Sequence, residues 1–380
     1  MVARDACGPA VSRLAGLYDR VTGTALGAYQ TAAVRIGVAG TWLAYLIREW
    51  PNRHELFGPD GPFSWELAQR ATARSGAFSV LLWSDGAVWF EACYLFAIAA
   101  SVALLLGWRT RTAAILFLIG VLSLQNRNSL VNNGGDNILH LVAIYLTFTR
   151  CGQVWSLDAR RGRDGAAGYP LWGATGAGLL AATVTGHLTA GWAVAFWGAW
   201  LVQALWWASR RRQRERAVLD AIANLTHNAA LLVIMAQICL LYLTAGLLKT
   251  QGTRWADGTA VYFSLRIDDF AVLPAVSELL SAHAVVVLVL TYATMAVQLA
   301  FPFSLVNRRV KNVLLVCLIA EHLGIALLLG LPFFSLAVIA VDLVFAPTSV
   351  LRRAGETVAR VARLPLRSGI RSSPDAGPVP

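Results

Sequence analysis

One lysine stands out among the residues that could carry out chemistry. Of the 32 Lys and Arg residues in the sequence, only Lys249 and Lys311 are lysines. Arginine stays protonated in proteins, whereas a lysine in an apolar site loses its charge readily and can act as a base or nucleophile. Lys249 ends a long apolar run, residues 229–248, and precedes a turn that contains Trp255. We interpret it as a candidate for proton transfer, with a lysine that snorkels at a membrane boundary as the simpler alternative.

Further ionisable residues interrupt apolar segments and are also candidates, because charges are costly inside a bilayer. They are Arg35, Glu91, Asp136, Glu321, His322 and Asp342. For each of Arg35, Glu91, Glu321 and Asp342, a buried ion pair that fixes helix register is the simpler explanation. The set as a whole predicts a polar cavity.

A polar turn, residues 132–137, contains two glycines between Asn133 and Asp136. Glycines permit a tight turn, and the flanking Asn and Asp side chains can then bond the backbone or line a cavity. Taken alone, the motif favours a turn between helices with Asp136 as the N-cap of the second helix.

The elements that position these residues are predicted from composition. With 57% hydrophobic and 14% charged residues and a mean hydropathy of +0.58, the chain cannot bury its apolar surface in a soluble globule. We predict an all-α, polytopic membrane helical bundle in contact with a lipid bilayer. Apolar stretches near the length of a bilayer span lie at about 25–47, 87–106, 112–131, 137–150, 171–187, 190–208, 220–247, 283–306, 313–330 and 332–347.

Ten stretches predict ten crossings, about eight in the core and two inserted. We divide the chain into a cytoplasmic segment 1–24, a transmembrane domain 25–350 and a flexible cytoplasmic tail 351–380, and we predict a two-helix insertion at 166–216. The pair within 171–208 could instead form a surface or re-entrant hairpin, which would leave the topology of the other helices unchanged. We expect the first apolar run to be a signal anchor rather than a cleaved signal.

The basic residues predict the orientation of the protein. With the N-terminus inside, the inner segments carry 23 Lys and Arg residues and the outer segments carry 7. Cytoplasmic loops retain basic residues, so both termini are expected in the cytoplasm of a cell-membrane protein. The net charge of +11 and the run 210–216 are then topological anchors rather than a nucleic-acid surface. The five isolated cysteines have neither metal-site spacing nor an expected disulfide.

Six short motifs, in the same order and at similar spacing, resemble the HTTM (horizontally transferred transmembrane) family. Bacterial membrane proteins share this domain with vitamin K-dependent gamma-carboxylases, and the resemblance covers about residues 25–350. The motifs are Arg35-Ile-Gly37; residues 106–111; Asn132-Asn133; residues 146–158; Tyr242-x-x-Ala245-Gly246-x-x-Lys249 with Trp255-x-x-Gly258; and His322 followed by residues 329–334.

The resemblance implies a role for Lys249, because the matching lysine of the carboxylases is understood as the base that deprotonates vitamin K hydroquinone. The departures argue against glutamate carboxylation. Gly134 stands where the carboxylases have a histidine, and Met235 stands where they tend to have an arginine. We also expect no large extracytoplasmic domain to follow the membrane core.

These considerations lead to one main hypothesis, an enzyme that uses a reduced quinone such as menaquinol at an outward-facing cavity around Lys249. Asn133, Asp136 and His322 would orient or stabilise the ionised quinol. Trp255 would pack on its ring, with Tyr242 nearby and Arg35 as a counter-charge. Two alternatives stay open: a non-enzymatic membrane partner in the maturation, export or immunity of a secreted peptide, and a small-molecule transporter. Against transport, no convincing internal repeat is found.

Overall fold

The computed structural model describes residues 9–161, 168–209, 212–267 and 272–362, and within them every regular element is a helix. The predicted all-α class is therefore confirmed for the described part of the chain. By length and composition, α5 (Ala87–Leu106), α11 (Gln213–Thr250) and α16 (Arg308–Leu328) can each cross a membrane. Two bent pairs, α14 (Pro274–Ser281) with α15 (Ala284–Ala300) and the segments Pro332–Phe345 and Thr348–Arg360, raise the number of candidate spans to at most five. These helices fit a membrane protein.

The predicted count of ten crossings is not confirmed by this criterion, for identifiable reasons. Arg35 and its polar neighbours lower the mean hydropathy of α2 (Ala28–Arg48), and residues 125–127 do the same for α6 (Thr110–Arg127). α7 (Gly134–Phe148) and α9 (Gly168–Val184) have 15 and 17 residues, fewer than a full span needs. α10 (Ala190–Ala208) is rich in tryptophan, which contributes little to hydropathy.

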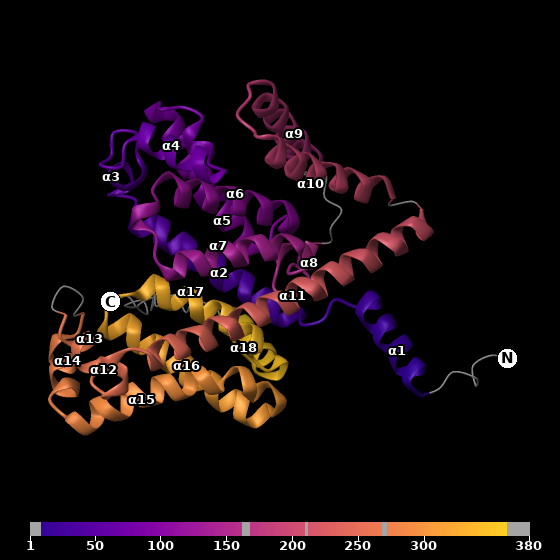
Figure 1. The fold of residues 1–380 in the computed structure, drawn as a ribbon. Helices are drawn as coiled ribbons and strands as arrows, with labels where there is room; N and C mark the ends of the chain where they lie inside the picture. The colour runs from indigo at the N-terminus through magenta and orange to yellow at the C-terminus, as the bar shows by residue number, and fades with distance from the viewer. Residues whose placement is uncertain (1–8, 162–167, 210–211, 268–271, 363–380) are drawn as a thin grey trace, which may run out of the picture.

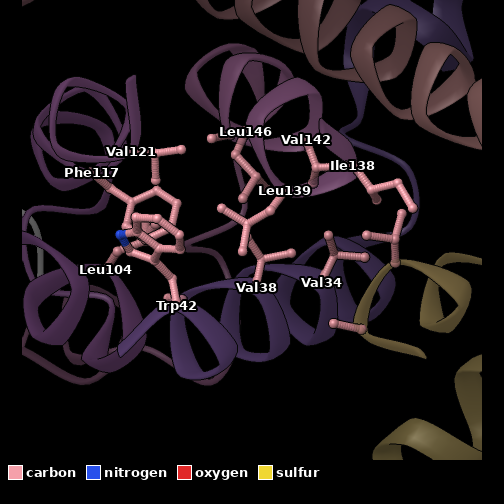
Figure 2. Close-up of a cluster of buried hydrophobic side chains, with 14 of the residues drawn as sticks. Val34, Val38, Trp42, Leu104, Phe117, Val121, Ile138, Leu139, Val142 and Leu146 are labelled. Atoms are coloured by element: carbon pink, nitrogen blue, oxygen red, sulfur yellow. The ribbon is translucent and has the colours of Figure 1, made fainter. Parts of the chain in front are cut away.

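The main hydrophobic core lies between α2, α5, α6 and α7, and α17 (Pro332–Asp342) packs against α2 and α7. Figure 2 shows Val34, Val38 and Trp42 of α2 pointing toward the side chains of α6 and α7. The helices approach closely where small residues face each other. A Cβ added to Gly37 of α2 would lie 2.5 Å from the Cβ of Ala340 in α17, the close contact that small residues allow in membrane bundles.

A second group of helices, α11, α15 and α16, packs beside this core (Figure 1). α11 is 38 residues long and runs past the bundle at its N-terminal end. There it packs against α1 (Pro9–Gly23). Asn224 donates a hydrogen bond to the Thr22 carbonyl, and Asn228 donates to the Val21 and Thr24 carbonyls. The segment 1–24, predicted to be cytoplasmic, is thus helical from Pro9.

The predicted insertion forms a helical hairpin, α9 and α10, which stands apart from the other helices in Figure 1. Trp172 and Trp200 stack at 3.8 Å between ring centroids and join the two helices. At its tip, Trp192 donates a hydrogen bond of 3.1 Å to the carbonyl of Gly76, and His187 lies 3.3 Å from the carbonyl of Trp83. The hairpin is thus attached to the bundle at the level of the loop between α4 (Trp65–Ser75) and α5.

The two long segments predicted as outer loops, residues 48–86 and 248–282, also contain helices. The first contains α3 (Arg53–Phe57), α4 and a 3-10 turn, and the second contains α12 (Thr253–Ala256), α13 (Ala260–Leu265) and α14. Buried Arg127 holds the first in place by donating to the carbonyls of Phe63 and Gly58 at 2.8 and 2.5 Å. The remaining elements are α8 (Leu157–Arg161), α18 (Thr348–Ala362) and short 3-10 helices at Val80–Leu82, Ser129–Val131, Pro302–Val306 and Leu343–Phe345.

Because α18 runs to Ala362, the first part of the segment expected to be flexible is helical. Residues 363–380 of that segment lie outside the described residues, as do Cys7 and Arg210–Arg211 of the basic run. The four cysteines at positions 93, 151, 239 and 317 are free.

Candidate functional site

The close approach of α11 and α15 places Lys249 in a polar cluster. A Cβ on Gly246 would lie 2.7 Å from the Cγ of Leu299, so only glycine allows the two helices to meet here. One turn beyond Gly246, the Nζ of Lys249 donates a hydrogen bond of 2.9 Å to the Oε1 of Gln298 in α15. The lysine therefore points between helices rather than outward.

A second hydrogen bond extends the chain of polar groups to α16. The Nε2 of Gln298 donates to the Oε1 of Glu321 at 2.5 Å. Gln298 is buried, and Lys249 and Glu321 are half-buried. Lys249 is also near enough for its charge to act on Glu321 and His322. A cation and an anion on neighbouring helices are thus joined through a neutral amide.

The turn after α11 folds back over the lysine. α12 places the ring of Trp255 with its centroid 5.2 Å from Lys249 Nζ, within the range of a cation–π contact. Asp257 stabilises this turn, because its Oδ1 accepts hydrogen bonds from the hydroxyl and amide of Thr259 at 2.5 and 3.0 Å. The bond from the hydroxyl, which has the larger effect, and the bond from the amide hold the pKa of the Asp257 carboxyl below its usual value.

A second polar group lies about two helical turns from Lys249 along α11, where α11, α16 and α17 meet. The hydroxyl of Tyr242 donates to the Oδ2 of Asp342 at 2.7 Å, and both residues are buried. His322 is also buried, and its ring centroid lies 6.3 Å from that of Tyr242. Both ring nitrogens of His322 and the Oδ1 of Asp342 are buried without a hydrogen-bond partner in the structure. Buried polar atoms of this kind call for a ligand, a water molecule or a proton.

The Asn133 turn reaches His322 through one aromatic ring. Phe334 lies 5.6 Å from the His322 ring between centroids, and its Cα would be 2.7 Å from a Cβ on Gly135. Within the turn, Asn133 Oδ1 accepts from the amide of Gly135 and Asp136 Oδ2 accepts from the amide of Asn133. Asn133 is therefore the N-cap of α7 and Asp136 its capping-box partner, which corrects the expectation that Asp136 is the N-cap.

Arg35 belongs to a different part of the molecule. Its guanidinium donates to the carbonyls of Leu104 and Leu105, at 2.6 and 3.1 Å, and to that of Trp155 at 2.6 Å. Asp158, in the same segment as Trp155, accepts from the amides of Arg109 and Thr110 at 2.8 Å each. Three of the six sequence motifs thus meet in one structural cluster, and Arg35 is positioned to hold loops rather than to balance a charge at Lys249.

The predicted buried ion pairs take another form. Arg35 donates to backbone carbonyls, Glu321 accepts from an amide, and Asp342 accepts from a phenol. Glu91, the fourth residue for which an ion pair was predicted, lies 2.8 Å from Arg53 and 2.7 Å from His54 and so has one. Backbone carbonyls at helix ends and uncharged side chains stabilise buried charges without the desolvation of a second ion.

The structure therefore places Trp255 against Lys249 and Tyr242 against His322. Glu321, next to His322 in α16, links the two groups through Gln298. The Asn133–Asp136 turn lies beside His322 across Phe334, and Arg35 is in a separate cluster. Sequence reasoning missed Gln298, the residue that connects two of the helices. Its signal was an uncharged polar side chain alone in the apolar run 283–306, which a search limited to ionisable residues passes over.

Among the described residues, no group of three or more His, Cys, Asp or Glu side chains is placed to hold a metal ion. No protein-family model, curated protein or solved structure matches this chain.

Proposed function

We propose that this chain is a multi-pass protein of the HTTM type in a bacterial cell membrane, with about eight core helices, the inserted hairpin α9–α10, and both termini in the cytoplasm. The basic inner segments support this orientation. It places the C-terminal end of α11 and the turn before α7 on the outer side. The Lys249 cluster would then open toward the extracytoplasmic face.

We infer that the cluster accepts a proton from a reduced quinone, such as menaquinol, bound beside Lys249. The observation that carries this inference is the pair of partnerless ring nitrogens on buried His322. One nitrogen can donate to a quinol oxygen, and the other can accept from a hydroxyl. Trp255 offers an aromatic surface to a ring at the same place. A small aromatic diol has the hydroxyls and the ring that these groups could contact.

The residues have distinct tasks in this proposal. A bound quinol would supply an acidic hydroxyl, and its two electrons would pass to molecular oxygen, the second substrate. Lys249, when neutral, would accept the hydroxyl proton at Nζ, and Gln298 would hold Nζ in place by its hydrogen bond of 2.9 Å. Glu321, linked through Gln298, would balance the resulting ammonium. Phe334 and Tyr242 would exclude water from the ring of His322.

Glutamate carboxylation is not part of this proposal. Gly134 stands at the position of the expected histidine, and a Cβ there would lie 3.4 Å from the ring of Phe334. That distance is an ordinary van der Waals contact, so the turn lacks the imidazole itself rather than the space for it.

The decisive experiment is the substitution Lys249→Arg in the full-length protein, assayed as menaquinol-dependent oxygen consumption in reconstituted vesicles. Arginine keeps the positive charge but cannot surrender its proton, so we expect a protein that inserts normally and loses activity by about 10²-fold or more. Lys311→Arg is the matched control, because Lys311 donates to the carbonyl of Phe345, a contact that a fixed charge preserves. Wild-type activity in Lys249→Arg would refute a base at this position.

A second candidate function is a non-enzymatic membrane partner for a secreted peptide. It is favoured by the completeness of the Lys249 contacts, since Gln298 and Trp255 would fix a permanent ammonium equally well. Under that reading Lys249→Arg keeps the cellular phenotype, whereas Lys249→Met removes it.

A further inference from the structure

The hairpin α9–α10 and the bundle enclose an apolar groove far from Lys249. The groove lies against α5 and α6, has a volume of about 540 Å³ and is lined mainly by aliphatic and aromatic side chains. Trp83 and Trp89 line it near the hairpin tip, and Trp172, Trp200 and Trp207 line it along the hairpin. This volume lies within the range of protein sites for small apolar ligands.

A basic pocket continues this groove at the base of the hairpin. It has a volume of about 410 Å³, and Thr112, Leu171, Gln203 and Trp207 line both cavities. Four arginines line the basic pocket together with one acidic residue, Asp158: Arg109, Arg111, Arg150 and Arg216. One continuous site thus has a cationic end and an apolar length.

Neighbouring groups hold the arginines in place. The guanidinium carbons of Arg111 and Arg216 each lie 3.9 Å from the ring centroid of Trp206. Asp220 lies 2.9 Å from Arg150 and 3.1 Å from Arg216. Asp158 is engaged in capping α6. Among the described residues that line this pocket, the four arginines outnumber the single acidic residue, so its lining is positively charged.

We propose that this site binds an anionic phospholipid, with its phosphate among the four arginines and an acyl chain in the groove. The proposal rests on the membrane embedding of the bundle and is independent of the chemistry at Lys249. Guanidinium groups match the geometry of phosphate oxygens, and basic pockets between membrane helices favour anionic headgroups. A zwitterionic lipid has the same phosphate and chains, but its ammonium group would meet the same arginines.

The test is native mass spectrometry of the full-length protein in neutral detergent, titrated with phosphatidylglycerol and phosphatidylcholine of identical chains. We expect phosphatidylglycerol to bind at least about 10-fold more tightly. Arg111→Gln with Arg216→Gln should weaken phosphatidylglycerol about 30-fold, from the attraction of about two charges, and leave phosphatidylcholine unchanged. The control, Arg352→Gln with Arg353→Gln, removes the same charge from α18, outside the pocket.

The groove is tested separately by Gly178→Leu. Gly178 lines the groove, and a Cβ there meets no atom within 4 Å, so a leucine fills the cavity without disturbing the helix. It should weaken phosphatidylglycerol and leave the oligomeric state and melting temperature as in the wild type. Equal binding of the two lipids, or equal losses in the pocket and control variants, would overturn the proposal. A polyprenyl phosphate that binds more tightly than phosphatidylglycerol would overturn the choice of phospholipid.

Discussion

Two carboxylates of the candidate site, buried Asp342 and half-buried Glu321, have uncharged partners. Asp342 accepts from the phenol of Tyr242, and Glu321 accepts from the amide of Gln298. Either partner can bond to the carboxylate or to the neutral acid by reorienting its polar group. A salt bridge would favour only the ionised form. The cluster can therefore keep its geometry when a proton enters or leaves, which suits proton transfer.

At the residue scale we predict that Tyr242→Phe lowers the free energy of unfolding by about 1–3 kcal/mol, because Asp342 is fully buried and loses the donor to its Oδ2. Thermal or denaturant unfolding in one detergent measures this effect. In the double variant Tyr242→Phe with Asp342→Leu, the penalty should be smaller than the sum of the single effects. Additive losses would show that the two side chains are not coupled.

Part of this cluster was predictable from sequence. Lys249 and His322 can be recognised from their residue types, because ionisable side chains are costly in apolar segments. Arg35 can be recognised in the same way. Its partners are backbone carbonyls, which every residue has, so the sequence does not indicate which carbonyls it contacts. Gln298 has no charge and no motif, and its role depends on the place where α15 crosses α11. Pairwise contacts between distant helices are a property of packing, which local patterns do not contain.

At the scale of elements, small residues determine how closely helices approach. Gly37 and Gly40 both lie in α2, but a Cβ at position 37 would be 2.5 Å from Ala340 Cβ, whereas one at position 40 would be 3.8 Å from Leu105. The first distance is a clash with a neighbouring helix and the second an ordinary contact. The glycine of the Arg35-Ile-Gly37 motif thus has a packing role.

We therefore predict that Gly37→Ala lowers the free energy of unfolding by about 1–3 kcal/mol through the overpacking of α2 against α17. Gly40→Ala should be neutral or slightly stabilising, because alanine has the higher helix propensity. The melting temperatures of the purified variants, compared in one detergent, decide between these outcomes. A Gly37→Ala protein as stable as Gly40→Ala would mean that α17 can shift to accommodate the methyl group.

The apolar stretches predicted most helices within a few residues. Thus the predicted stretch 87–106 coincides with α5. The predicted stretch 313–330 ends two residues after the last residue of α16, Leu328. The helices of the outer segments were missed, because α3 and α12 have only five and four residues and no full period of apolar side chains. Their helical form depends on the bundle surface beneath them, as the bonds from Arg127 illustrate.

At the scale of the whole molecule we predict that both termini face the cytoplasm and that the segments 48–86 and 248–282 face outward. An alkaline phosphatase fusion after Leu265 should be active, and one after Ser209 should not. A cysteine introduced at exposed Gly186, the tip of the hairpin, should react with an impermeant maleimide added outside. An inactive phosphatase fusion at residue 265, together with a bright cytoplasmic reporter at the same position, would show that the predicted topology is wrong.

The position of Arg35 has a consequence for biogenesis. α2 emerges from the ribosome first among the apolar helices, but the carbonyls that Arg35 contacts belong to Leu104, Leu105 and Trp155, which are synthesised later. Until Trp155 has emerged, the guanidinium lacks one of its acceptors, and an arginine at the centre of a helix opposes insertion by about 2.5–3.5 kcal/mol. We expect α2 to wait beside the insertion machinery, and to be released into lipid only when the segment through α8 has joined it.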